Sequence, residues 1–248
     1  MNPNCKGRRW AALTALLALG ALPLAAQDLV VKESVKTSST MMGGSNRNVT
    51  STTYYSSKAI KFAGVDNRES IVRLDDQKVI TVDHEKKTYT ETTFRELEET
   101  VARLGAEMEK NKEQLEAMRK MMGPAPDSFT VERIGAGEAI AGYQTVKYLV
   151  KGPFEVEVWA APELKLPSQY YDLMKMRMPR NPLFDAGKMY DEMKKISGMS
   201  LRSVMTVRMM GRETKTTTEA VSVESTSLPP STFAVPAGYT LEARKEMK

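Results

Sequence analysis

The sequence predicts an α+β protein, in which an antiparallel, β-rich domain carries a helical cover. Three observations support this fold class. Most of the chain after residue 27 consists of short runs rich in Val, Thr and Tyr, separated by polar or glycine-containing turns. One segment, residues 94–122, has an apolar stripe at helical spacing. Residues 162–199 combine methionine with proline, which favours short, broken helices.

The N-terminal segment has the three parts of a secretory signal peptide. A basic start from Lys6 to Arg9 precedes an almost unbroken run of Ala and Leu, and Ala25 and Ala26 then precede polar residues. We expect cleavage after Ala26, so that 1–26 is the signal peptide. An uncleaved N-terminal anchor is the alternative, and the sequence leaves open whether export uses the Sec or the twin-arginine route.

Cleavage would change the composition of the mature chain. The full chain has 36 basic and 31 acidic residues, and the first 26 residues hold three basic and no acidic ones, which leaves 33 against 31. This near balance gives no support for a nucleic-acid surface. Cys5, the single cysteine, precedes the apolar run, so the mature chain has no disulfide and no cysteine for a lipid anchor. We expect one domain, residues 27–248, in the periplasm or outside the cell, without a stable transmembrane segment.

The expected strands fall into three groups. A meander before the helix comprises 28–40, 49–62, 71–74, 78–82 and 88–92. Three strands after the helix comprise 128–134, 143–151 and 154–160, and Gly152-Pro153 makes the last turn a tight hairpin. A final hairpin pairs 201–210 with 214–225 around Gly211.

The clearest periodic signal lies between two strand groups. Thr93 followed by Glu96 forms a capping box, and Gly123-Pro124 gives a stop, which predicts a helix over residues 94–122. Its apolar positions are Phe94, Leu97, Val101, Leu104, Met108, Leu115, Met118 and Met122, and Asn111 interrupts the stripe. The helix is expected to lie across the sheet. The alternative is that its distal half projects and pairs with another chain.

Methionine is unusually frequent, with 17 residues in the chain. Met174, Met176 and Met178 alternate within the methionine- and proline-rich segment. Flexible, polarisable side chains suit a surface that must adapt to an apolar ligand of variable shape. Ordinary core filling and binding of copper(I) by thioethers are the alternatives.

Four segments carry a resemblance to a known family. Residues 86–90 lead into the helix, 140–148 and 157–164 span strand ends, and 233–239 read FAVPAGY. Together they resemble a family of exported bacterial domains of unknown function whose fold is similar to that of the lipoprotein carrier LolA. The resemblance implies a strongly curved antiparallel sheet, close to a half-barrel, covered by helices with an apolar cavity between. Carriers of this type hold acyl chains there.

The sequence contains none of the common catalytic signatures. His84, the single histidine, lies in a charged turn, and hydrolase, nucleotide and zinc motifs are absent. We expect no enzyme activity, no catalytic residue, no cofactor and no metal. The expected ligand is an apolar small molecule or a lipid or lipoprotein acyl chain, bound under the helical lid. The residues expected to contact it are Phe94, Leu97, Val101, Leu104, Met108, Trp159, Met174 and Met178. The alternative is a protein-interaction or envelope-stress regulatory module whose partner is an envelope protein.

Overall fold

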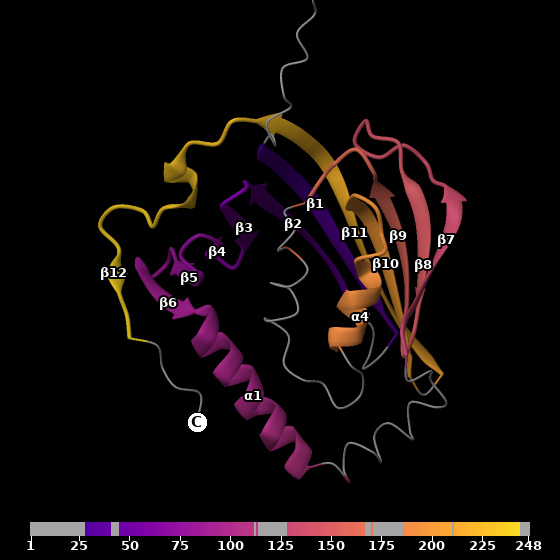
Figure 1. Ribbon diagram of the computed structural model, residues 1–248, viewed down its shortest axis with the longest axis horizontal. Helices are drawn as coiled ribbons and strands as arrows, with labels where there is room; N and C mark the ends of the chain where they lie inside the picture. The colour runs from indigo at the N-terminus through magenta and orange to yellow at the C-terminus, as the bar shows by residue number, and fades with distance from the viewer. Residues whose placement is uncertain are drawn as a thin grey trace, which may run out of the picture.

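The computed structural model describes residues 28–40, 45–111, 113, 128–166, 170, 186–209 and 211–243. These residues form one sheet of twelve strands, two α-helices and a short 3-10 helix (Figure 1). The strands are β1 Asp28–Ser39, β2 Ser45–Tyr55, β3 Ala59–Val65, β4 Arg68–Arg73, β5 Lys78–Asp83, β6 Thr88–Thr93, β7 Thr130–Ala136, β8 Val146–Lys151, β9 Glu155–Ala161, β10 Met199–Met209, β11 Arg212–Thr226 and β12 Thr240–Leu241. The helices are α1 Phe94–Lys110, α4 Ala186–Met193 and η1 Pro230–Phe233.

The sheet joins two meanders through a long-range pair of strands. Its order is β12-β6-β5-β4-β3-β2-β1-β11-β10-β9-β8-β7. Strands β1 and β11 pair antiparallel, with Val31 opposite Val223. The described chain thus begins in the middle of the sheet. Only β12 pairs in parallel, with Thr240 opposite Thr88 of β6, among the described strands. This mostly antiparallel, curved and unclosed sheet with helices agrees with the α+β fold class expected from the sequence.

One face of the curved sheet carries both α-helices. Side chains alternate between the two faces of a strand, so Ile60, Val72 and Val79, which are paired across β3, β4 and β5, share one face. Phe94 and Leu97 of α1 pack against the cluster that these residues form. We call this the inner face, and Figure 1 shows α1 and α4 on the inner side of the arc.

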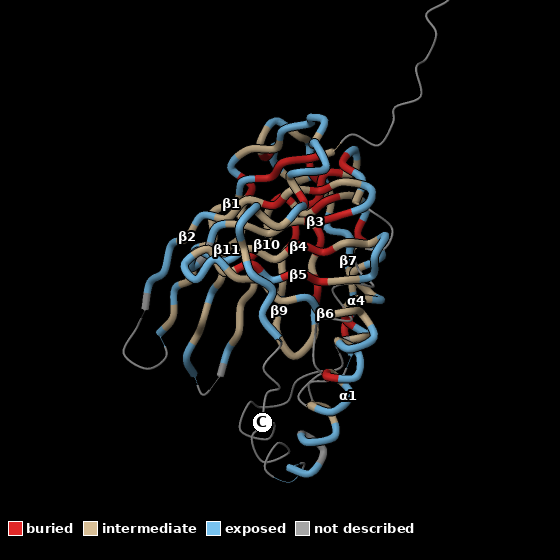
Figure 2. The backbone as a smooth tube through the Cα atoms, turned by 90° about the vertical axis from the view of Figure 1, so that its left-hand side faces the viewer, coloured by how far each residue is buried: buried red, intermediate tan, exposed pale blue. Residues whose placement is uncertain are grey.

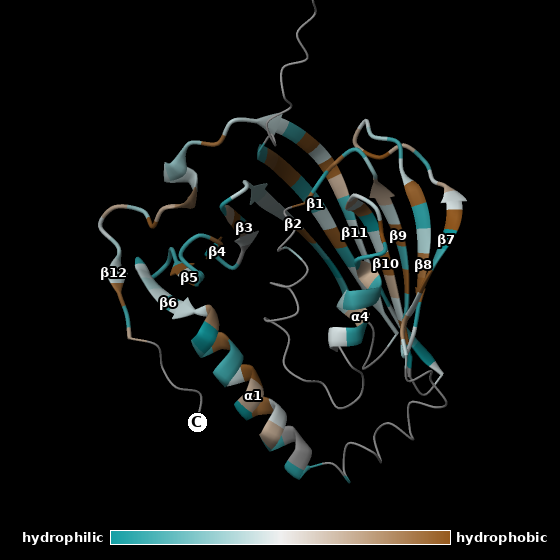
Figure 3. Cartoon of the chain, in the orientation of Figure 1, coloured by the Kyte–Doolittle hydropathy of each residue, from teal (hydrophilic) through white to brown (hydrophobic). Residues whose placement is uncertain are grey.

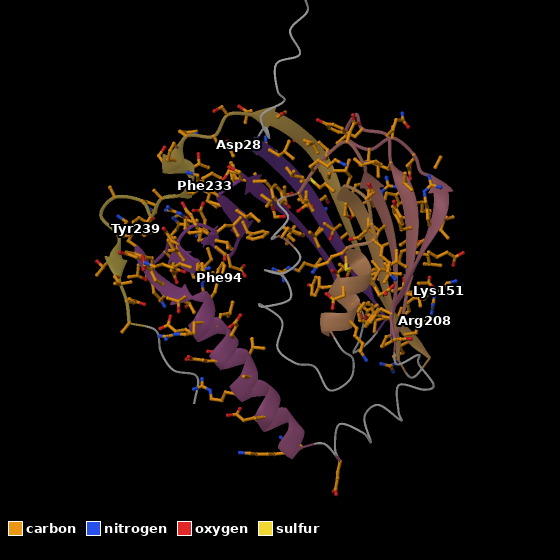
Figure 4. The ribbon with its side chains drawn as sticks, viewed as in Figure 1. Asp28, Phe94, Lys151, Arg208, Phe233 and Tyr239 are labelled. Carbon is orange, nitrogen blue, oxygen red and sulfur yellow. The ribbon has the colours of Figure 1, made fainter. Side chains whose placement is uncertain are left out.

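The opposite, outer face of β3 to β5 is covered by the C-terminal segment. Ile71, Ile80 and Val82 form a buried cluster with Phe233 of η1. Figure 4 labels Phe233 and Tyr239 on this segment, which runs past β3 to β6. The described residues of this end therefore bury apolar side chains on both faces of the sheet, and Figure 2 marks buried stretches of β3, β4 and β5.

Two sequence predictions differ from the structure in detail. The strand expected over residues 49–62 is divided into β2 and β3. Ser56 makes the turn because its hydroxyl oxygen accepts the N–H of Ala59 at 2.9 Å. The helix begins at Phe94 as expected, and its described part ends at Lys110. The predicted continuation to residue 122 and most of the expected methionine- and proline-rich helices lie outside the described residues. No helix within the described ranges has the length and apolar character needed to cross a membrane.

Candidate functional site

Helix α1 is fixed to the end of β6 by the capping box that the sequence predicts. The N–H of Glu96 donates to Thr93 Oγ1 at 3.2 Å, and the N–H of Thr93 donates to the Glu96 carboxylate at 2.7 Å. The first bond satisfies an N–H that the first helical turn leaves without a partner, and the second satisfies the cap residue itself. The local sequence therefore sets where α1 begins and brings its first turn against the inner face.

The first turn of α1 supplies two of the expected ligand contacts to the inner face. Phe94 and Leu97 pack against the cluster that contains Tyr55, Ile60 and Val72. Figure 4 labels Phe94 where α1 leaves β6. The two side chains connect the helix to strands β2, β3 and β4, so the sheet end of the helix is anchored by apolar packing.

Val101 and Leu104 continue the same stripe further along α1, and Figure 3 shows the hydrophobic side of the helix. Both side chains are half-buried, and neither belongs to a buried cluster of the described residues. Figures 1 and 2 show α1 running away from the sheet beyond its start. The described residues therefore cover this part of the stripe only in part. The side chain of Met108, the next expected contact, lies outside the described residues.

Helix α4 covers the other end of the inner face. Met189 is buried in one cluster with Tyr148, Val150 and Val158 of strands β8 and β9. The loop after α4 is tied to the same strands because the N–H of Ser197 donates to the Tyr148 hydroxyl at 3.4 Å. Methionine thus packs on the inner face here. The two methionines that the sequence analysis selected, Met174 and Met178, lie outside the described residues.

Trp159, another of the expected ligand contacts, is buried in the cluster against which Phe94 and Leu97 of α1 pack. Its neighbour Val158 belongs to the other cluster, with Met189 of α4. The Lys147 ammonium lies 4.6 Å and the Arg202 guanidinium 5.3 Å from the centroid of the Trp159 ring. Cation–π contacts of this kind help to hold the ring in place.

A set of polar side chains on β2 interrupts the apolar inner face. Thr53 and Tyr55 of this strand are buried, and Tyr55 is hydrogen-bonded to the side chains of Thr53 and Tyr170. The rings of Tyr55 and Tyr170 lie 6.2 Å apart. Burial is the main reason why the pKa of Tyr55 is well above its ordinary value, and the charges of Tyr170 and Glu33 raise it further. Tyr55 is therefore a neutral hydroxyl at physiological pH.

Glu33 stands beside this group on the inner face of β1. Its side chain is half-buried, and burial raises the pKa of its carboxyl. Glu33 is not among the site residues predicted from the sequence. The sequence nevertheless indicates this residue. Glu33 belongs to the same alternating row of β1 as Leu29, Val31 and Val35, and an acidic side chain is unexpected in a row that faces a covered side of the sheet.

The inner face becomes polar toward the tip of the β10–β11 hairpin. Thr37 of β1 lies opposite Thr216 of β11, with 3.3 Å between their hydroxyl oxygens, and Ser39 lies opposite Thr214 at 2.8 Å. The apolar part of the same face starts at Leu29 and Val31. The face therefore changes from apolar to hydroxyl-rich along β1, with Glu33 between the two regions.

Binding of a metal ion would require a group of suitable side chains among the described residues. No group of three or more His, Cys, Asp or Glu side chains within the described ranges could hold a metal ion. Both ring nitrogens of His84 make contacts within the protein. Its Nδ1 is hydrogen-bonded to the Tyr239 hydroxyl at 2.9 Å, and its Nε2 lies 3.4 Å from the Glu69 carboxylate. The arrangement on the inner face can bury an apolar group and offer it a polar boundary.

Comparisons with known proteins place this architecture in a family. A solved protein of Thermus thermophilus, described as an uncharacterized conserved protein, is similar with a TM-score of 0.44 and 7% identity, over 88% of this chain and 91% of that one. A LolA superfamily protein from Nitrosomonas europaea is similar with a TM-score of 0.34 and 6% identity, over 84% and 90%. A comparison with curated protein sequences found no match. The family model described as Domain of unknown function (DUF4412) matches residues 56–239, and the chain therefore belongs to this family.

Proposed function

We propose that the protein is a non-enzymatic binding protein that holds an apolar ligand, an acyl chain or similar group, between α1 and the inner face of the sheet. The observation that carries the proposal is the uneven packing of one stripe on α1. Phe94 and Leu97 pack on the apolar cluster, whereas Val101 and Leu104 are only half-buried. An apolar chain placed between the helix and the inner face would remove this remaining apolar surface from water.

The proposal includes export. The signal-like segment 1–26 would be cleaved after Ala26, and the mature chain 27–248 would act in the periplasm or outside the cell. The sequence resemblance to LolA-like carriers supports the same class of ligand. The hydroxyl-rich region beyond Glu33 would then accommodate a polar group at one end of the bound chain.

Displacement of a neutral fluorescent probe tests this function. Phenylnaphthylamine would be bound to the mature protein and displaced with straight-chain alcohols of increasing length. Each buried methylene contributes about 0.8 kcal/mol, so the affinity should rise about fourfold per added methylene until the site is filled. A protein that binds no probe, or that binds all chain lengths equally, would exclude an apolar site.

A second candidate function rests on the direction of α1. Figures 1 and 2 show the helix leaving the sheet, and its exposed polar side and half-buried stripe are typical of a helix that docks on a protein partner. In this alternative the chain is an interaction or envelope-stress regulatory module. Sedimentation of the mature protein distinguishes the two, because self-association that is lost in Leu104→Glu while probe binding is kept would favour the interaction module.

A further inference from the structure

The inner face of β1 contains one charged residue where its neighbours are apolar or carry only a hydroxyl. Leu29, Val31, Glu33, Val35 and Thr37 alternate along the strand and share this face. The lysines of the same strand occupy the other row, and one of them, Lys32, forms an ion pair with Glu224 at 3.9 Å on the outer face. The sequence thus separates the charges of β1, with cations outward and one carboxylate inward.

No Lys, Arg or His side chain among the described residues forms an ion pair with Glu33. Strands β2 and β11 flank β1, and the nearest cation that the register places on their inner side is Arg47, opposite Thr37. Thr37 lies four positions along the strand from Glu33, so the backbone distance between the two residues is about 13 Å. A half-buried carboxylate without a counter-ion is costly, and burial accordingly raises the pKa of Glu33.

The surroundings of Glu33 suit one end of an amphiphile. On one side lie Leu29 and Val31, which belong to the apolar cluster. Ser51 of β2 lies directly opposite Glu33, and Thr53 lies opposite Val31. Hydroxyl groups can accept hydrogen bonds from a donor bound at the carboxylate. A chain directed toward Val31 would therefore place its head group at Glu33.

We infer, on the basis of the proposed function, that the ligand is an amphiphile that carries an ammonium group. Glu33 is its counter-ion, and its chain lies on the apolar part of the inner face. An ammonium has three donors and would pair with the carboxylate while the hydroxyls of Ser51 and Thr53 accept its remaining hydrogens. A fatty acid would instead bring a second carboxylate to Glu33, and like charges at short distance repel. The site therefore favours a positively charged head group over a negatively charged one.

The test compares three ligands with the same chain and different heads: dodecylammonium, dodecanol and dodecanoate, each below its micelle concentration at neutral pH. Displacement of phenylnaphthylamine gives their affinities for the wild type, Glu33→Gln and Glu224→Gln. Glu224 is a matched control because it is an exposed carboxylate on the outer face. In the wild type and Glu224→Gln, dodecylammonium should bind about tenfold more tightly than dodecanol, and dodecanoate more weakly than either. Glu33→Gln should lose this ranking and keep its affinity for dodecanol.

The outcomes separate the two proposals. If dodecanol binds and the wild type prefers dodecanoate, or ranks the three heads equally, the inference about the head group is overturned while the apolar site stands. The same holds if Glu33→Gln keeps the preference for ammonium. If none of the three binds, the proposed function fails and the inference fails with it. The ranking in the wild type is decisive even if Glu33→Gln does not fold.

Discussion

The imidazole of His84 and the hydroxyl of Tyr239 lie 2.9 Å apart, although 155 residues separate them in the sequence. Their rings meet edge to face, with centroids 5.7 Å apart. His84 follows β5 and Tyr239 precedes β12, so the contact fastens the C-terminal segment to the sheet. The same segment places Phe233 over the outer face of β3 to β5.

The first prediction concerns this contact. Tyr239→Phe removes the hydroxyl and keeps the ring, so the loss should be that of one hydrogen bond, about 0.5 to 1.5 kcal/mol of unfolding free energy. Urea unfolding measures the change. Because His84 is the only histidine, its ring resonances in NMR spectra should also shift in Tyr239→Phe. Unchanged stability together with unchanged His84 resonances would contradict the contact.

The second prediction concerns the entry into β10. Gly198 has φ of +90°, and a Cβ there would lie 2.0 Å from the carbonyl oxygen of Ala161. Gly198→Ala therefore adds a clash with backbone to an unfavourable conformation, and we expect a loss of more than about 3 kcal/mol or failure to fold. Gly211→Ala is the matched control. It has φ of +74° and open space, so it should cost only about 1 kcal/mol. Equal losses in the two variants would exclude the close approach of Gly198 to β9.

The third prediction concerns the stripe of α1. Val101→Asp places a charge on the half-buried side of the helix and should weaken binding of phenylnaphthylamine at least tenfold, with a stability loss of about 2 to 4 kcal/mol. Ala102→Asp introduces the same charge one residue away, on the exposed side, and should change neither property substantially. Leu104→Ala adds no charge and separates lost apolar contact from lost folding. Equal probe binding by Val101→Asp and Ala102→Asp would remove α1 from the site.

The fourth prediction follows from the raised pKa of Glu33. Between the ordinary and the raised pKa the folded protein binds more protons than the unfolded chain, so stability decreases as pH rises through this window. Glu33→Gln lacks this titration. Its unfolding free energy, relative to that of the wild type, should therefore increase as the pH rises from the ordinary carboxyl pKa through the raised pKa of Glu33. Urea unfolding across this range provides the measurement. A difference between the two proteins that does not change with pH would mean that Glu33 is solvated in the folded state.

Local patterns account for the parts of the fold that the sequence predicted. The capping box at Thr93 and Glu96 depends on residues three positions apart, and the structure shows both of its hydrogen bonds. The hairpin turn at Gly211 likewise depends on one residue that tolerates positive φ. Such signals are complete within a few residues, so a sequence pattern can indicate them.

The pairing of strands far apart in the sequence could not be predicted from such local patterns. The pairing of β1 with β11 joins residues nearly two hundred positions apart, such as Val31 and Val223, and nothing in either strand specifies its partner. The face of each strand is equally hidden. Period two separates Val158 from Trp159, but only the structure shows that the two side chains belong to different clusters. For the same reason the position of Glu33 on a covered face could not be predicted.

Native mass spectrometry of the protein, purified without detergent from the cells that produce it, tests the central claim most directly. The account predicts a chain that begins at Gln27 and carries one bound amphiphile, which is released when the protein is denatured in organic solvent. A ligand-free protein that also fails to bind phenylnaphthylamine or dodecylammonium after refolding would contradict the claim that the inner face holds an apolar ligand.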